Sequence, residues 1–175
     1  MPLLSLVSQK FILHWGEMGT RWGVNRTVAQ IHALLLLSAR PLPAEEIAET
    51  LSVARSNVST SLRELQGWGI VRVVHVMGDR RDHFESLKDV WEMFQIILEQ
   101  RKRREVDPTL DLLRECVAQA GSSSGSASYE RKRLLDMLEF FETMARCYEE
   151  FRQVPPGALR SFVKVRGKFR KLFSR

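Results

Sequence analysis

Residues 44–87 constrain the fold of this chain most strongly, because they combine two short amphipathic helices with two strands. Two sets of apolar residues recur with helical spacing, Ile47, Ala48 and Leu51 in the first run and Val58, Leu62 and Leu65 in the second. Ser52 and Val53 lie between the runs, which predicts a tight turn. The sequence therefore predicts two short helices joined at an angle, a helix-turn-helix.

The second of these helices is predicted to carry a polar outer face. At about 100° per residue, Ser56, Thr60 and Arg63 fall within about 60° of one another, opposite the apolar side. Small polar side chains and arginine suit the major groove of DNA, where an apolar or acidic face does not. Ala54 occupies the expected N-cap position without a side-chain acceptor, so a hydroxyl of Ser52 or Ser56 is expected to replace it.

A β-hairpin is predicted directly after the second helix. Residues 70–76 are rich in β-branched side chains, residues 78–79 are typical of a turn, and residues 82–87 return as a second strand. Arg80 and Arg81 lie at or beside the tip, where arginine can reach phosphates or a narrow minor groove. A helix-turn-helix followed by such a hairpin is a winged helix.

Helices are also predicted on both sides of this unit. Apolar stripes at helical spacing predict them at residues 3–22, 26–39, 87–104 and 129–152. Asn25 is expected to cap the helix at 26–39, and residues 40–43 to form a short extended piece beside the hairpin. Pro108 in a first turn predicts a separate helix from Asp107, and residues 121–128 have the composition of a loop.

The predicted fold class is mainly α with a small β-hairpin wing, flanked by N- and C-terminal dimerisation helices. Three regions follow from it: an N-terminal helix at 1–24, a DNA-binding domain at 25–87, and a C-terminal helical region with a basic tail at 88–175. Helices with apolar faces outside a winged helix need another surface to cover them. A second subunit is the simplest source of such a surface. A twofold dimer also places two recognition helices on adjacent major-groove faces of DNA.

The positive charge of the chain is concentrated in its tail. The net charge is +6, and residues 151–175 hold eight Lys and Arg without any Asp or Glu. Residues 1–150 therefore hold 19 basic and 21 acidic side chains, so DNA affinity must come from a few placed arginines, the tail, or dimerisation. The tail fits a helix covering the dimer interface, an arm contacting phosphates, or an amphipathic helix on an anionic membrane.

Catalysis, metal binding and membrane insertion find little support in the sequence. The four histidines form no arrangement with a Ser or Cys nucleophile, and no glycine-rich phosphate loop is present. Cys116 and Cys147 lack metal-ligand spacing and are expected to be ordinary thiols, with a redox switch as the alternative. The absence of a bilayer-length apolar run and of a signal peptide pattern predicts a cytoplasmic protein without cofactors.

Three motifs carry a resemblance to a known family: Trp-Gly-Val at residues 22–24, the helix-turn-helix at 44–65, and the wing at 78–82. With them, residues 11–85 resemble the GbsR branch of the MarR-like winged-helix transcriptional regulators. The resemblance implies a dimeric DNA-binding regulator, usually a repressor, and some relatives respond to choline-like osmolytes. A quaternary ammonium needs an aromatic cage. The candidate cage residues are Trp15, Trp22, Trp91, Phe94 and Tyr148.

We therefore expect a homodimeric regulator, more often a repressor, that binds a pseudo-palindromic operator in double-stranded DNA and is open to control by a small-molecule effector. Eight residues are predicted to contact DNA: Arg55, Ser56, Asn57, Ser59, Thr60, Arg63, Arg80 and Arg81. Arg55 is expected to meet phosphate, and the wing arginines the backbone or minor groove. The alternative is a winged-helix protein-interaction module that does not bind DNA, which the near-neutral charge of residues 1–150 favours.

Overall fold

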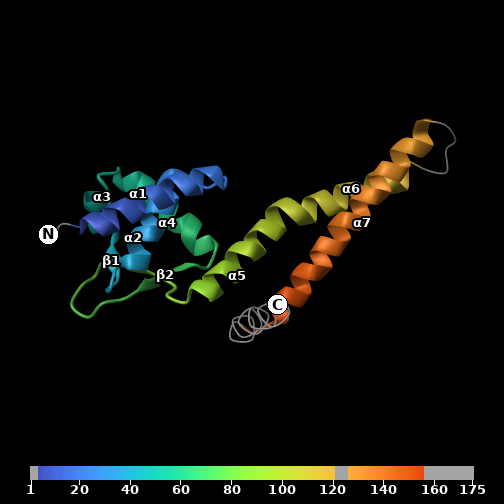
Figure 1. Ribbon diagram of the computed structural model, residues 1–175. Helices are drawn as coiled ribbons and strands as arrows, with labels where there is room; N and C mark the ends of the chain where they lie inside the picture. The colour runs from blue at the N-terminus through green and yellow to red at the C-terminus, as the bar shows by residue number, and fades with distance from the viewer. Residues whose placement is uncertain (1–3, 121–125, 156–175) are drawn as a thin grey trace, which may run out of the picture. The chain divides into compact units, whose positions relative to one another are not determined.

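The computed structural model describes residues 4–120 and 126–155 of a mostly helical chain with a small antiparallel sheet (Figure 1). The chain divides into two compact units between Ile96 and Ile97, within helix α5 (Val90–Arg101). The other elements of the first unit are α1 (Leu6–Arg21), α2 (Arg26–Leu37), β1 (Leu42–Pro43), α3 (Ala44–Leu51), α4 (Arg55–Gly67), β2 (Val71–Val74) and β3 (His83–Ser86). This order is that of a winged helix, which confirms the predicted fold class.

The three strands form one sheet in the order β1-β3-β2, with both pairings antiparallel. Phe84 in the central strand faces Leu42 on one side and Val73 on the other. The predicted extended piece beside the hairpin is thereby confirmed. Pro43 fits the outer strand β1 because proline has no N–H to donate to a second neighbour.

Helix α2 lies at the centre of the core of the first unit. Its Ile31 and Leu35 are fully buried and share the core with Ile47 of α3. The predicted apolar side of α4 is confirmed, because Val58, Leu62 and Leu65 are all buried. Burying this side fixes the rotation of α4 about its axis and so turns its opposite, polar side to solvent.

The ends of α2 are closed by two different side chains. At the start, the Thr27 N–H donates to Asn25 Oδ1 at 2.8 Å, which confirms the predicted cap. At the end, the Lys88 ammonium donates to three carbonyls that lack helical partners, those of Leu35 at 2.9 Å, Leu36 at 3.2 Å and Ser38 at 2.7 Å. Lys88 follows β3, so this contact ties the end of the wing to α2.

The second unit contains α6 (Asp107–Gln119) and α7 (Ser126–Gln153), which run side by side, as Figure 1 shows. The predicted start of a helix at Asp107 is confirmed, but this helix is continuous with α5, because a π-helical turn, η1 (Lys102–Val106), carries the backbone from α5 into α6. Within it the Asp107 N–H donates to the Lys102 carbonyl, five residues back. Pro108 has no N–H, and a wider turn accommodates it without breaking the helix.

Helix α7 begins at Ser126, so the predicted loop at 121–128 extended too far; residues 121–125 lie outside the described part of the chain. Leu110 and Leu113 of α6 are buried in this unit. In contrast, α7 keeps several large apolar side chains exposed, namely Tyr129, Leu135, Met137, Phe140 and Met144. The basic tail lies outside the described residues beyond position 155.

Candidate nucleic-acid interface

Helix α4 presents the predicted polar face to solvent. Ser56, Asn57, Thr60 and Arg63 are exposed, and Ser59 is half-buried at the flank. Arg63 lies back along its own helix, with Nε 3.4 Å from the Ser59 carbonyl oxygen and Nη2 3.4 Å from Thr60 Oγ1. Hydrogen bonds of this length are weak. The Arg63 guanidinium is therefore available to a stronger acceptor.

The start of α4 lacks the expected hydroxyl cap. Ala54 is the N-cap residue and no side chain accepts from the first turn, so the expectation for Ser52 and Ser56 was wrong. Ser52 instead ends α3, with a left-handed φ of 54° and its N–H bonded to the Ala48 and Glu49 carbonyls. Because the Ser52 backbone closes α3 in this conformation, the Ser52 hydroxyl does not cap α4.

Arg55, in the first turn of α4, is held by side chains of the protein itself. Its Nε and Nη2 donate to Glu45 Oε1 at 3.1 and 2.6 Å, and its Nη1 donates to Ser59 Oγ at 2.9 Å. The pKa of Glu45 lies below its usual value, because first its own backbone N–H and then Arg55 favour the carboxylate. A phosphate contact by Arg55 remains a prediction, and it requires the hydrogen bonds between Arg55 and Glu45 to break.

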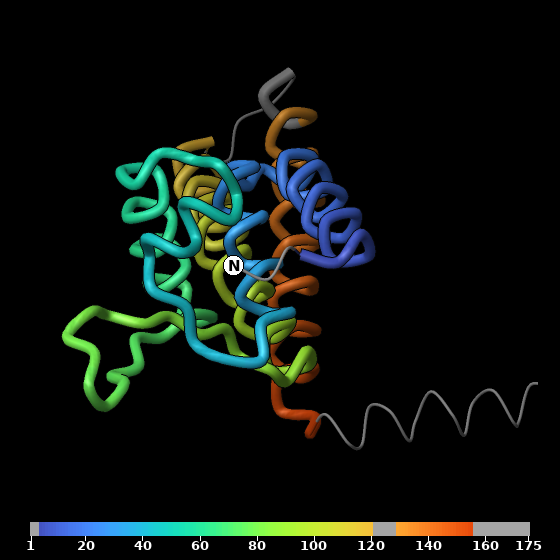
Figure 2. The backbone as a smooth tube through the Cα atoms, turned by 90° about the vertical axis from the view of Figure 1, so that its left-hand side faces the viewer, coloured from blue at the N-terminus to red at the C-terminus, as the bar shows by residue number. Residues whose placement is uncertain are grey.

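The wing is the segment between β2 and β3, residues 75–82, and it projects away from the helices (Figure 2). Its tip is a turn closed by the Asp79 N–H donating to the Val76 carbonyl at 3.1 Å. Gly78 has a φ of +84°, a conformation that side-chain-bearing residues rarely adopt, and Met77 beside it is fully exposed. The predicted turn is thereby confirmed.

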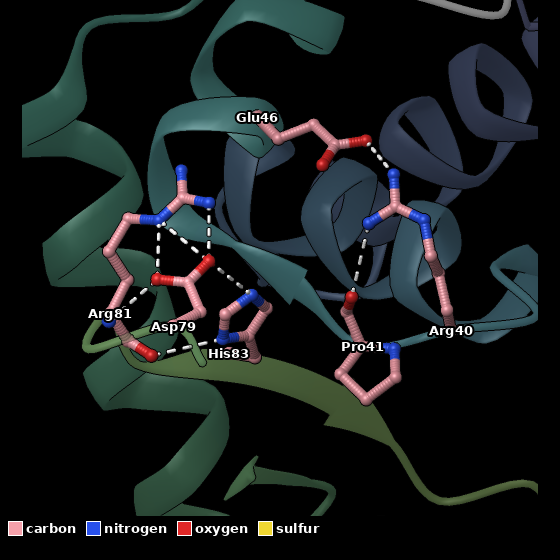
Figure 3. A network of polar contacts seen from close by, with 6 residues as sticks. All are labelled: Arg40, Pro41, Glu46, Asp79, Arg81 and His83. Atoms are coloured by element: carbon pink, nitrogen blue, oxygen red, sulfur yellow. Dashed lines mark hydrogen bonds and ion pairs between the residues drawn. The ribbon is translucent and has the colours of Figure 1, made fainter. Parts of the chain in front are cut away.

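The two wing arginines differ in what they contact. Arg81 Nε donates to Asp79 Oδ1 at 3.0 Å and to Oδ2 at 3.1 Å, as Figure 3 shows. Arg81 holds the pKa of Asp79 far below its usual range, mainly through this side-chain hydrogen bond. Arg80 is exposed and forms no hydrogen bond or ion pair within residues 4–120 and 126–155. Of the two wing arginines, Arg80 is therefore the one whose guanidinium is not paired within these residues, and its phosphate contact remains a prediction.

Sequence reasoning missed three residues that act on these arginines: Glu45, Asp79 and His83. Glu45 is ten positions from Arg55, and only the angle between α3 and α4 brings the two together. Asp79 was identified as a turn residue, although its place two positions before Arg81 is a usable signal. His83 is buried in β3 beside the buried Phe84, and its place in a predicted strand gave no sign of a polar role.

The residues proposed for an aromatic cage do not form one cluster within a single unit. Trp15 contacts Trp22 edge to face at 5.5 Å, stacks on Phe11 at 5.4 Å and lies 6.4 Å from the His32 ring. Tyr148 belongs to the second unit, where its hydroxyl donates to Glu99 Oε2 at 2.6 Å. Burial, followed by that hydrogen bond, raises the pKa of Tyr148 to about 12. The cage remains a prediction.

The residues of this candidate interface lie within a segment that is similar to a known protein family. Residues 22–82 match the sequence model of the MarR family, and the match covers α2 to the end of the wing. Over these residues the chain is similar to the MarR family. No curated protein matches the chain.

Two solved structures resemble a larger part of the chain than residues 22–82. A crystal structure described as a transcriptional regulator has a TM-score of 0.65 and 21% identity, covering 83% of this chain and 95% of its own. The second is a S. aureus MepR mutant bound to an oligodeoxyribonucleotide, with a TM-score of 0.35 and 13% identity, covering 81% and 95%. The first shows that the likeness of fold continues past residues 22–82. No helix among the described residues combines the length and apolar character needed to cross a bilayer.

Proposed function

We propose that this chain is a DNA-binding transcriptional regulator of the GbsR branch, working in the cytoplasm as a homodimeric repressor without catalytic activity. Helix α4 enters the major groove, and the wing lies on the backbone or in the minor groove. One observation carries the proposal: burial of Val58, Leu62 and Leu65 turns a face of small polar side chains and Arg63 to solvent. A helix face of this composition fits base edges and phosphates.

The charges of the interface support a specific rather than a bulk electrostatic binding mode. Arg63 and Arg80 are available, whereas Arg55 and Arg81 are partly neutralised by Glu45 and Asp79. Residues 1–150 carry a slight excess of acidic side chains. One copy of this face offers few free cations, so two copies on adjacent groove faces are needed for tight binding.

Exposed apolar side chains on α7 support the dimer. Phe140 is 59% and Met144 52% exposed, which is unusual for large apolar residues on one helix. A second copy of the chain would cover them. Phe140→Asp with Met144→Asp should convert the dimer to a monomer in sedimentation, while Lys132→Glu, an exposed polar position on α7, should leave the dimer intact. A dimer that survives the double change would remove α7 from the interface.

Selection of bound duplexes from a random-sequence library, followed by salt titration, tests the proposed function. We expect enrichment of a sequence with twofold symmetry and an affinity that falls steeply with salt. The alternative, a winged-helix interaction module, rests on the near-neutral charge of residues 1–150. Recovery of no sequence, together with no salt-sensitive binding to any duplex, would establish that alternative over the regulator. Added choline-like compounds in the same assay test the effector.

A further inference from the structure

His83 is a buried histidine at the base of the wing, and both of its ring nitrogens face acceptors. It lies in β3, with Pro43 of β1 and Val74 of β2 as its neighbours across the sheet. Nδ1 is 3.0 Å from the Arg81 carbonyl oxygen, and Nε2 is 3.4 Å from Asp79 Oδ2 (Figure 3). The His83 ring thus contacts both the main chain of Arg81 and the Asp79 carboxylate that binds the Arg81 side chain.

This pair of acceptors fits the protonated ring better than the neutral one. A neutral imidazole carries one N–H, so when Nδ1 donates to the Arg81 carbonyl, the Nε2 lone pair faces the Asp79 carboxylate. The imidazolium donates at both nitrogens and adds an attractive charge opposite Asp79. Histidine is the side chain whose charge can change within the pH range in which a DNA-binding assay is run.

Asp79 and Arg81 link His83 to the charged groups of α3. Asp79 accepts from Arg81 on one side and faces His83 on the other, so the two cations share one carboxylate. From α3, Glu45 and Glu46 attract the Arg81 guanidinium, and Glu46 is itself bound by Arg40. The nearby Arg72–Glu85 pair on β2 and β3 is self-compensating.

We propose that His83 is a positioning residue for the wing: it sets the place of Arg81 through Asp79, and its protonation strengthens DNA binding. When His83 gains a proton, the Asp79 carboxylate accepts a hydrogen bond from the ring. Its hydrogen bonds to Arg81 are then weaker, so the Arg81 guanidinium can bind a phosphate more readily. The wing also gains one positive charge. The inference rests on the proposed function, in that the wing is taken to contact DNA.

The test compares the affinity of the full-length chain for a mixed-sequence duplex at about pH 6 and about pH 8. We expect the wild type to bind about 3- to 10-fold more tightly at the lower pH, with a salt slope steeper by up to about one. His83→Gln, which cannot become charged, should lose this difference. His75→Gln is the matched control, because His75 is an exposed histidine of the same wing segment.

An equal pH dependence in wild type and His83→Gln would overturn the proposal, as would its loss in His75→Gln. A second readout needs no DNA: the chemical shifts of the His83 ring protons by NMR, with and without Asp79→Asn. Removing the carboxylate should change these shifts, and unchanged shifts would also overturn the proposal. Failure to bind DNA at any pH, with the NMR shift intact, would refute the proposed function and leave the His83–Asp79 coupling standing.

Discussion

The Arg55 guanidinium binds the Glu45 carboxylate across the turn between α3 and α4, with Nη2 and Oε1 2.6 Å apart. Both side chains are about half exposed, so the pair contributes little to stability. Its consequence lies in the charge at the start of α4, where a cation predicted to meet phosphate is already paired. Under the proposed function, this pairing limits the non-specific attraction of the protein to DNA.

Replacing Glu45 by Gln should therefore raise DNA affinity. The change leaves Arg55 without its carboxylate partner, so we expect about 3- to 10-fold tighter binding to mixed-sequence duplexes and a salt slope steeper by about one. Fluorescence anisotropy over a salt series measures both. Glu49→Gln, which removes an exposed acid of the same helix that has no ion pair among the described residues, controls for net charge. The same gain in both variants would rule out a special role for the Glu45–Arg55 pair.

Lys88→Met should destabilise the first unit. Methionine keeps the aliphatic stem but leaves the carbonyls of Leu35, Leu36 and Ser38 without their donor. We expect a loss of about 1–3 kcal/mol in the free energy of unfolding, measured with urea. Lys10→Met, at an exposed position of α1, should stay within about 0.5 kcal/mol of the wild type. Equal losses would show that Lys88 does not stabilise the end of α2.

The close contact of α1 with α2 predicts different costs at two glycines. A Cβ added at Gly19 would lie 2.5 Å from Ala29 Cβ, whereas one at Gly16 would lie 2.6 Å from Gln30 Cγ. Ala29 cannot move without its backbone, but Gln30 can change rotamer. Gly19→Ala should therefore lose about 1–3 kcal/mol in thermal unfolding. Gly16→Ala should stay within about 1 kcal/mol, because alanine favours the helix. A smaller loss of stability for Gly19→Ala than for Gly16→Ala would contradict the close contact between α1 and α2.

The buried His32 should make the protein less stable in acid. Burial lowers the pKa of His32 from 6.5 to about 4. Between these values the unfolded chain takes up a proton that the folded chain refuses, so stability falls as the pH falls through this window. The loss should total about 3 kcal/mol. Because Nε2 has no hydrogen-bond partner in the described part of the chain, His32→Leu should fold and should lack this component. Parallel pH profiles for the two proteins would exclude it.

Periodicity was sufficient to predict the elements whose positions depend on an apolar face. The rotation of α4 followed from the spacing of Val58, Leu62 and Leu65, and the Asn25 cap from residue type alone. The π-helical turn before Pro108 was missed, because a proline stops a helix only where the backbone cannot widen to receive it. The missing acceptor at Ala54 was predicted, but the expected replacement by a serine hydroxyl was wrong, because Ser52 takes a left-handed conformation at the corner between the two helices.

The exposure of the candidate residues on α4 could be predicted, but the ion pairs of the candidate arginines could not. The exposed positions on α4 follow from its apolar side, so the polar face was predictable. The pairing of Arg55 with Glu45, and of Arg81 with Asp79 and His83, depends on the angle between elements and on the path of the wing. Arg55 and Arg81 must therefore break an ion pair before they can bind DNA as proposed, whereas Arg63 and Arg80 need not.

The central claim is that α4 distinguishes one DNA sequence from another while the wing holds the backbone. The most direct test measures the affinity of Arg63→Ala and Arg80→Ala for the selected duplex and for a random one. Arg63→Ala should weaken binding to the selected duplex by about 1–3 kcal/mol and barely affect the random one. Arg80→Ala should weaken both alike. An equal loss on both duplexes for Arg63→Ala would contradict the account.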